Sequence, residues 1–354
     1  MSMTHSLSRL FCLSAVIFFI AIKSSRLQCQ DNERKLAGYE VTFPCMGTLV
    51  SLLAFSDDPI LVENAFQEAR KEMDRLVKIF SDYDEESETR QATIDAKIGN
   101  WQAVSPELWE VMCACDDWNR LSDGAFDASV GRLTVLWRKA RKSKLIPTEI
   151  EIEEACNYCG WNHIELDKDA NRVRINRAGL RLDFGAIAKG YIIEKTFELL
   201  ASRGLSRSLV RAGGDIRCGQ APPGKDGWKI EIASIEDADK HPPHPPQFVL
   251  TNAAISSSGD LHQYMFINGK RRSHVIDPRT GVGVEGPMMV TVIASNAMDA
   301  DGADTAICVM GHDAGMALVK SRPDLHLRII SRLGVDPKQN TRISISPGFP
   351  LLLP

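Results

Sequence analysis

Residues 288–294 read MMVTVIA, an apolar run with one threonine, rich in β-branched residues and typical of a buried strand. Residues 295–305 follow at once as SNAMDADGADT, which predicts a helix directly after that strand. Residues 228–233 alternate apolar and other side chains, as a half-buried strand does. Because the strands and helices along the chain do not alternate as βαβ units, the sequence predicts an α+β fold with antiparallel sheets flanked by helices.

The helix predicted after residues 288–294 carries three oxygen-bearing side chains on one face. Asp301, Asp304 and Thr305 stand at positions i, i+3 and i+4. Carboxylate and hydroxyl oxygens are the ligands that hard cations such as Mg²⁺ prefer. The alternative is a polar first turn, in which the two acids favour the helix dipole and Thr305 caps or packs.

Other elements can be expected from turn and cap signals. Asp58 and Ser105, each followed by proline, are typical helix starts, and the second of these helices should end near Gly124. Residues 41–53 predict two strands around a turn at Met46-Gly47-Thr48, residues 172–175 and 179–184 predict a hairpin, and residues 189–200 predict a helix.

Composition limits the class of protein. The 354 residues are 44% hydrophobic and 25% charged, as in a globular protein. The net charge of −4 gives no sign of a nucleic-acid partner. Nine cysteines include Cys156 and Cys159 in a CxxC pair, for which we expect buried thiols or a local disulfide, because no further CxxC or histidine lies at zinc-finger spacing.

Residues 1–29 have the pattern of a signal peptide or an N-terminal membrane anchor. Arg9 precedes an apolar run over residues 10–22, which is shorter than the roughly 20 residues of a spanning helix. Cys29 leaves lipidation open as an alternative. Each outcome places the body, residues 36–354, outside the cytoplasm. We therefore expect an exported protein, either periplasmic or anchored to the extracytoplasmic face of the inner membrane.

Glycine-marked segments between the elements could approach a ligand. Residues 182–190 join a strand to a helix start, where small residues, a helix N-terminus and Lys189 favour an anion, although a tight turn with a surface lysine is equally compatible. Residues 213–215 and 256–260 are glycine- and serine-rich turns, either of which can be a bend without function. Residues 273–281 place His274 beside an Asp-Pro turn, which makes it a candidate general base.

Taken in order, these segments resemble the ApbE family of FAD:protein FMN transferases, and the resemblance extends over residues 41–311. It is carried by Met46-Gly47-Thr48, Phe80-Ser81 with Tyr83, Ser87-Glu88, residues 124–137, residues 182–190, Gly213-Gly214-Asp215, Ser258-Gly259-Asp260, residues 274–281 and residues 300–305.

The resemblance implies a fold, a reaction and a set of site residues. It implies a single large ApbE-like (T-fold-like) domain that binds FAD and Mg²⁺, transfers FMN to a threonine or serine hydroxyl of an acceptor protein, and releases AMP. The acceptor would be a flavoprotein subunit of a membrane redox complex. It places the metal on Asp301, Asp304, Thr305 and the carbonyl of Ala186, and the flavin nucleotide on Met46, Tyr83, Ala125, Phe126, Asp127, Asp183, Lys189 and Ile276.

The chemistry of these residues is compatible with that reaction. We expect His274, or the nearby acid Asp260, to take the proton from the acceptor hydroxyl. Tyr83 and Phe126 could stack on flat rings, although ordinary packing is the alternative for each. Two other functions stay open, an FAD pyrophosphatase in which water replaces the hydroxyl and a non-catalytic flavin-binding protein of the cell envelope, because all three would use much the same site.

Overall fold

The computed structural model describes residues 36–94, 98–233, 235, 245–260, 263–267, 269–332 and 341–353. The predicted leader over residues 1–29 lies outside these ranges. Within them, no helix combines the length and the apolar character that crossing a membrane requires.

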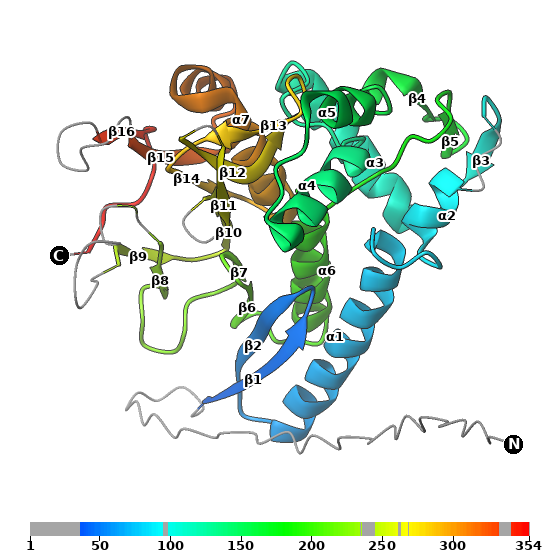
Figure 1. The fold of residues 1–354 in the computed structure, drawn as a ribbon. Coiled ribbons are helices and arrows are strands. Elements are labelled where there is room, and N and C mark those ends of the chain that lie inside the picture. The colour runs from blue at the N-terminus through cyan, green and yellow to red at the C-terminus, as the bar shows by residue number, and fades with distance from the viewer. Residues whose placement is uncertain are drawn as a thin grey trace, which may run out of the picture.

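An eight-stranded sheet forms the centre of the fold, and its neighbouring strands are all antiparallel (Figure 1). The predicted α+β class is thus confirmed. The strands lie in the order β1 (Ala37–Cys45), β2 (Thr48–Ser56), β6 (Ser208–Ala212), β7 (Asp215–Cys218), β10 (Ala253–Gly259), β14 (Met288–Ala294), β15 (His326–Arg332) and β16 (Thr341–Ile345).

Helices cover one face of this sheet, and smaller sheets lie apart from it (Figure 1). The helices are α1 (Pro59–Phe80), α2 (Glu88–Ile94), α3 (Pro106–Leu121), α4 (Gly131–Ser143), α5 (Glu149–Cys156), α6 (Ala188–Ser202) and α7 (Ala297–Ser321). The smaller sheets are β3 (Trp101–Ala103), β5 (Arg172–Ile175) and β4 (Ile164–Asp167); β11 (Tyr264–Ile267), β12 (Lys270–Asp277) and β13 (Val282–Glu285); and β8 (Trp228–Glu231) with β9 (Gln247–Leu250). The sheet of β3, β4 and β5 lies beyond the helices (Figure 1).

Strand β14 shows why residues 288–294 are almost all apolar; the exception, Thr291, has its hydroxyl 3.0 Å from Ser257 Oγ. Val290 and Val292 belong to the core under the helices, whereas Ile293 packs on the opposite face with residues of β8 and β9. Alternate side chains of a strand point to opposite faces, so a strand covered on both faces needs apolar residues at nearly every position. The predicted strand has the observed bounds.

The predicted helix starts are confirmed by their caps. The Asp58 side chain accepts hydrogen bonds from the backbone N–H groups of Ile60 and Leu61 at the start of α1. The Ser105 side chain accepts from Leu108 N–H at the start of α3, which ends at Leu121 and so slightly before the predicted end near Gly124. Residues 189–200 lie within α6, and residues 41–53 fall on β1 and β2 around the turn at Met46 and Gly47.

The predicted hairpin of residues 172–175 and 179–184 is wrong. Strand β5 pairs with β3 and β4 instead. Residues 179–184 do show strand-like alternation, because Leu180, Leu182 and Phe184 are buried. Their backbone hydrogen bonds, however, join the segment before α4, with Gly131 N–H donating to Arg181 O and Asp183 N–H donating to Ala128 O. Alternation identified an extended segment but not its partner.

The cysteines in the described part of the chain are free thiols. Cys156 and Cys159 are half-buried, and burial, followed by the charge of Asp127, raises the pKa of Cys159 to about 12. The sequence predicts either buried thiols or a local disulfide for the CxxC pair, and the structure has two thiols.

Candidate functional site

A cavity of about 340 Å³ brings together most of the predicted site residues, at a size typical of small-molecule sites. It lies among α4, the start of α6, β12 and α7. The predicted residues that line it are Tyr83, Ala125, Phe126, Asp127, Asp183, Ala186, Lys189, His274, Ile276, Asp301 and Thr305. Met46, Asp260 and Asp304 are the predicted residues that do not line it.

Helix α7 divides the three side chains predicted to bind a metal between the cavity and the sheet. Successive helical residues turn by about 100°, so positions i+3 and i+4 lie about 60° and 40° to either side of position i. Asp301 and Thr305 line the cavity, whereas Asp304 is fully buried and faces β10. There it accepts hydrogen bonds from Ser256 Oγ at 2.6 Å and Ser258 Oγ at 2.9 Å. Asp304 is therefore held rigidly behind the other two.

Three buried carboxylates surround the ammonium group of Lys189. Lys189 forms an ion pair with Asp215, and the Ser256 hydroxyl lies between the other oxygen of Asp215 and Asp304, which share its one proton. Burial opposes the charge on Lys189, but the carboxylates of Asp215, Asp301 and Asp304 outweigh that effect and raise its pKa. Lys189 therefore stays protonated and holds the acidic cluster together.

The acidic cluster carries an uncompensated charge. Three carboxylates and one ammonium sum to −3 + 1 = −2 when all are ionised. Burial, followed by the charge of neighbouring acids, raises the pKa of Asp301 and of Asp304. Such a site favours protons or a cation, and its donors are all oxygen, which fits Mg²⁺.

The donor set is short of carboxylates for a metal site made by side chains alone. Within the described ranges, no three His, Cys, Asp or Glu side chains are arranged to hold a metal ion. The predicted set has two carboxylates, Asp301 and Asp304, and otherwise relies on the Thr305 hydroxyl and the Ala186 carbonyl. Mg²⁺ commonly takes few protein carboxylates and completes its shell with water and substrate phosphates, so the set fits that ion.

Gly190 allows α6 and α7 to approach closely enough to build this cluster. A Cβ atom at position 190 would lie 2.2 Å from the Ala297 carbonyl oxygen and 2.7 Å from Asp301 Cβ. The Gly190 N–H donates to Asp301 Oδ2 at 2.8 Å. Because glycine lacks a side chain, the backbone of one helix fixes a carboxylate of the other.

Arg138 on α4 contacts two other residues that line the cavity, Asp183 and Tyr83. Its guanidinium donates to Asp183 Oδ2 at 2.8 Å and to Asp82, and it stacks 4.3 Å from the ring centroid of Tyr83. Asp183 also accepts from Gly185 N–H at 2.8 Å, which shapes the turn before α6. Tyr83 is 76% exposed, so one aromatic face is available to a ligand.

The loop before α4 is fixed by its own polar groups. Asp127 accepts hydrogen bonds from the N–H groups of Ser129 at 2.7 Å and Trp161 at 3.1 Å. Burial outweighs these bonds and raises the pKa of Asp127. The Phe126 ring is 1% exposed and lies in the main core. The burial of Phe126 agrees with the packing alternative, while the residue also lines the cavity.

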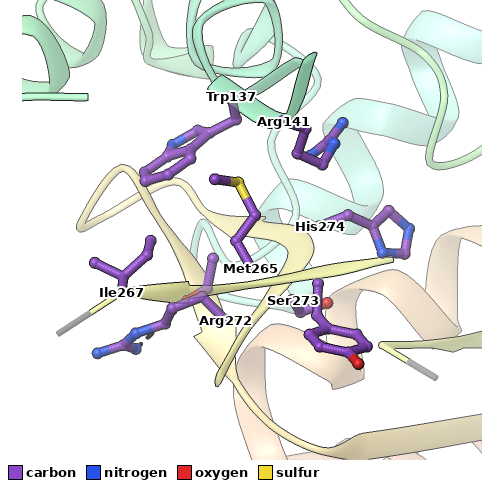
Figure 2. A pocket seen from close by; sticks show the side chains of 9 residues that line it. Trp137, Arg141, Met265, Ile267, Arg272, Ser273 and His274 are labelled. Atoms are coloured by element: carbon purple, nitrogen blue, oxygen red, sulfur yellow. Dashed lines mark hydrogen bonds between the residues drawn. The ribbon is translucent and has the colours of Figure 1, made fainter. Parts of the chain in front are cut away.

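His274 stands on β12 at the edge of the cavity. Figure 2 shows it beside Arg141 at one end of a small pocket whose other end holds Trp137 and Ile267. Burial, and then the positive charge of Arg141, lowers the pKa of His274. The imidazole is therefore neutral at physiological pH, which is the form that a general base needs.

Asp260 and Met46 have structural surroundings. Asp260 is fully buried, accepts from Arg271 Nε at 2.6 Å through one oxygen, and accepts from Met288 N–H at 2.8 Å through the other. Both of its oxygens are thus occupied in joining β10, β12 and β14. Met46 has a positive φ of 50° in the turn between β1 and β2, and its side chain packs on the core.

Sequence reasoning missed Arg138 and Arg141. Both line the cavity, together with Thr134 on the same helix. Positions 134, 138 and 141 recur at helical spacing beside the buried stripe of Leu133 and Trp137, which was the available signal. Two cations on one helical face beside a lysine suit a phosphorylated ligand.

Comparisons with known proteins identify a family and several similar chains. The model of the ApbE family matches residues 46–329. The chain is 29% identical over 309 residues to an FAD:protein FMN transferase of Vibrio cholerae, covering 84% of this chain and 89% of the relative. It is 27% identical over 315 residues to the FAD:protein FMN transferase of Salmonella typhimurium, covering 87% of each.

Solved structures share the fold. The crystal structure of the ApbE protein from Thermotoga maritima superposes with a TM-score of 0.75 at 29% identity, covering 88% of this chain and 97% of that one. The flavinyl transferase ApbE of Pseudomonas stutzeri gives a TM-score of 0.74 at 25% identity, with 88% and 95% covered. From the family match, which spans most of the sequence, the chain belongs to the ApbE family.

Proposed function

We propose that this chain is an FAD:protein FMN transferase. The names of its relatives support this activity. The observation that carries it to this chain is that one cavity joins an all-oxygen acidic cluster, three cations and a neutral histidine. A dinucleotide offers a pyrophosphate to the cations and two flat ring systems to the walls.

The transfer exchanges the phosphoanhydride bond of FAD for a phosphoester bond to the acceptor. The hydroxyl oxygen of a threonine or serine on the acceptor forms a bond to the phosphorus of the FMN half of FAD. The bond from that phosphorus to the bridging oxygen breaks, and AMP leaves with the electron pair. The acceptor hydroxyl gives its proton to His274, whose neutral imidazole lies at the cavity edge.

Residues of this chain hold the phosphates. Lys189 lies in the first turn of α6, where the helix N-terminus and its ammonium both favour an anion. Arg138 and Arg141 add positive charge from α4. Asp301, Asp304, Thr305 and the Ala186 carbonyl would hold Mg²⁺, which supplies positive charge that neutralises the phosphate oxygens.

We further propose an acceptor and a compartment. The apolar run of residues 10–22 supports export, and an exported transferase would act on extracytoplasmic domains of membrane redox proteins. The N-terminus of the protein purified from cells, determined by mass spectrometry, tests the leader. Recovery of an intact N-terminus in the cytosolic fraction would contradict export.

The transfer itself is tested with the purified body, FAD, Mg²⁺ and an acceptor domain that carries one candidate threonine. The proposal predicts a flavin-fluorescent acceptor whose mass rises by one FMN residue, and no labelling of the same domain with that threonine replaced by alanine. Asp301→Ala should abolish the labelling. AMP and FMN without a labelled acceptor would identify a pyrophosphatase, and FAD binding without turnover would identify a carrier.

A further inference from the structure

A second cavity, of about 480 Å³, adjoins the first. The two share Ser257, Gly259, Gln263 and His274 in their linings. His274 thus lies where the two cavities meet. A group that enters from the second cavity can reach the same imidazole as a ligand bound in the first.

The second cavity differs from the first in chemistry. Its walls are largely aliphatic, with Ile216, Ile230, Ile232 and Met289, and Glu231 is the only acidic or basic side chain apart from His274 among its described lining residues. The first cavity contains three cations, Arg138, Arg141 and Lys189, and three carboxylates, Asp127, Asp183 and Asp301. A charged ligand is therefore favoured in the first cavity and an uncharged one in the second.

The second cavity is bordered by the edge of a strand. Residues 230–233 line it consecutively, although neighbouring side chains of a strand point to opposite faces, so the backbone edge itself borders the space. Strand β8 pairs with β9 on one side, and no strand in the described ranges pairs with its other side.

Hydrogen bonding identifies which backbone groups face outward. Ile232 N–H donates to Pro246 O, on the β9 side. In an antiparallel pair, alternate residues direct their N–H and C=O groups to opposite edges. Glu231 and Ala233 therefore offer theirs to the cavity, and both side chains are exposed.

We propose that the second cavity is the groove for the acceptor protein, which binds there as an uncharged extended segment along the free edge of β8. This inference rests on the proposed transferase activity and adds a second binding site to it. An extended segment pairs with a strand edge through main-chain hydrogen bonds and places alternate side chains in flanking pockets. Its hydroxyl then meets His274 at the junction, opposite the phosphates in the first cavity.

Position 233 allows the groove to be blocked without touching the first cavity. Ala233 is exposed, and it lines only the second of the two cavities. Ala233→Trp should fill the groove. Ala170→Trp, in an exposed turn between β4 and β5 that lines neither cavity, is the matched control. Thermal unfolding by circular dichroism establishes that both variants fold.

The proposal predicts a split in kinetic constants. Ala233→Trp should raise the KM for the acceptor domain by about tenfold or more, as expected for loss of binding common to ground and transition states. Its affinity for FAD, measured by flavin fluorescence, should equal that of the wild type. Ala170→Trp should change neither constant. An unchanged acceptor KM in a folded Ala233→Trp variant would overturn the groove, whereas a wild-type protein that labels no acceptor would overturn the transferase instead.

Ala233→Pro tests the strand edge separately. Proline removes the outward N–H without adding bulk to block the groove, and extended backbone before a proline is favoured. We expect the acceptor KM to rise about threefold to tenfold, the factor that corresponds to one net hydrogen bond. If Ala233→Trp raises the acceptor KM and Ala233→Pro leaves it unchanged, the cavity remains the acceptor site, but pairing along β8 is contradicted.

Discussion

Gly190→Ala tests whether the contact between α6 and α7 builds the acidic cluster. The added methyl group would meet the Ala297 carbonyl oxygen at 2.2 Å and Asp301 Cβ at 2.7 Å. Neither atom is the end of a flexible side chain. The two helices must therefore separate at this point, and the hydrogen bond from Gly190 N–H to Asp301 Oδ2 must lengthen.

The expected cost follows from three contributions. Overpacking of this kind costs about 1–3 kcal/mol. Weakening a hydrogen bond to a charged group adds up to about 1.5–3 kcal/mol, and the higher helix propensity of alanine returns about 1 kcal/mol. The net loss is about 1.5–5 kcal/mol, which for a domain of this size lowers Tm by roughly 2–7 °C. Because Asp301 moves, Mg²⁺-dependent turnover should fall more than stability alone would explain.

Gly204→Ala is the control, since Gly204 follows the end of the same helix. It has a φ of +83°, and no atom lies within 4 Å of the place that a methyl group would take, so alanine adds backbone strain without a clash. We expect about 1 kcal/mol of destabilisation with wild-type turnover. Differential scanning calorimetry and the FMN transfer assay measure both quantities. Wild-type Tm and turnover in Gly190→Ala would refute the reasoning.

Three further predictions concern the walls of the cavity. His274→Ala should slow transfer about 10²–10⁴-fold. Because burial lowers the pKa of His274, wild-type kcat/KM should be flat above about pH 6.5 and fall only at more acidic pH. If the variant keeps this fall in kcat/KM at acidic pH, the titrating group is not His274. Arg138→Ala leaves Asp82 and Asp183 without their shared partner, so it should destabilise the fold by about 2–3 kcal/mol. The same variant should raise the KM for FAD. An unchanged KM would contradict the placement of Arg138 in the FAD site. Asp304→Asn should weaken activation by Mg²⁺ about 10–100-fold in a metal titration, and an unchanged titration would remove Asp304 from the metal site.

Features that depend on short spacing could be predicted from the sequence. The closeness of Asp301, Asp304 and Thr305 follows from helical geometry, although Asp304 faces β10 and not the cavity. The caps at Asp58 and Ser105 are local hydrogen bonds. The ordered motifs of the family then connected segments as distant as Tyr83 and Ile276, which the structure places around one cavity. Spacing alone could not have joined them.

Features that depend on a partner distant in the sequence could not be predicted in this way. Residues 179–184 have the alternation of a hairpin strand, yet their backbone bonds to residues 128–131. The sequence suggests a chemical role for Asp260, but Arg271 and the Met288 amide occupy its oxygens. Asp215 stands out in the sequence only as part of a turn, because its ion pair with Lys189 forms between a strand and a helix.

The central claim is that FMN moves from FAD to a protein hydroxyl in the cavity formed by α4, α6, β12 and α7. The most direct measurement is the ratio of AMP released to FMN bound covalently to the acceptor threonine, followed over time with and without Mg²⁺. We expect one AMP for each labelled threonine, with both products absent without Mg²⁺ and in Asp301→Ala. Release of AMP without label, or labelling that persists in Asp301→Ala, would contradict it.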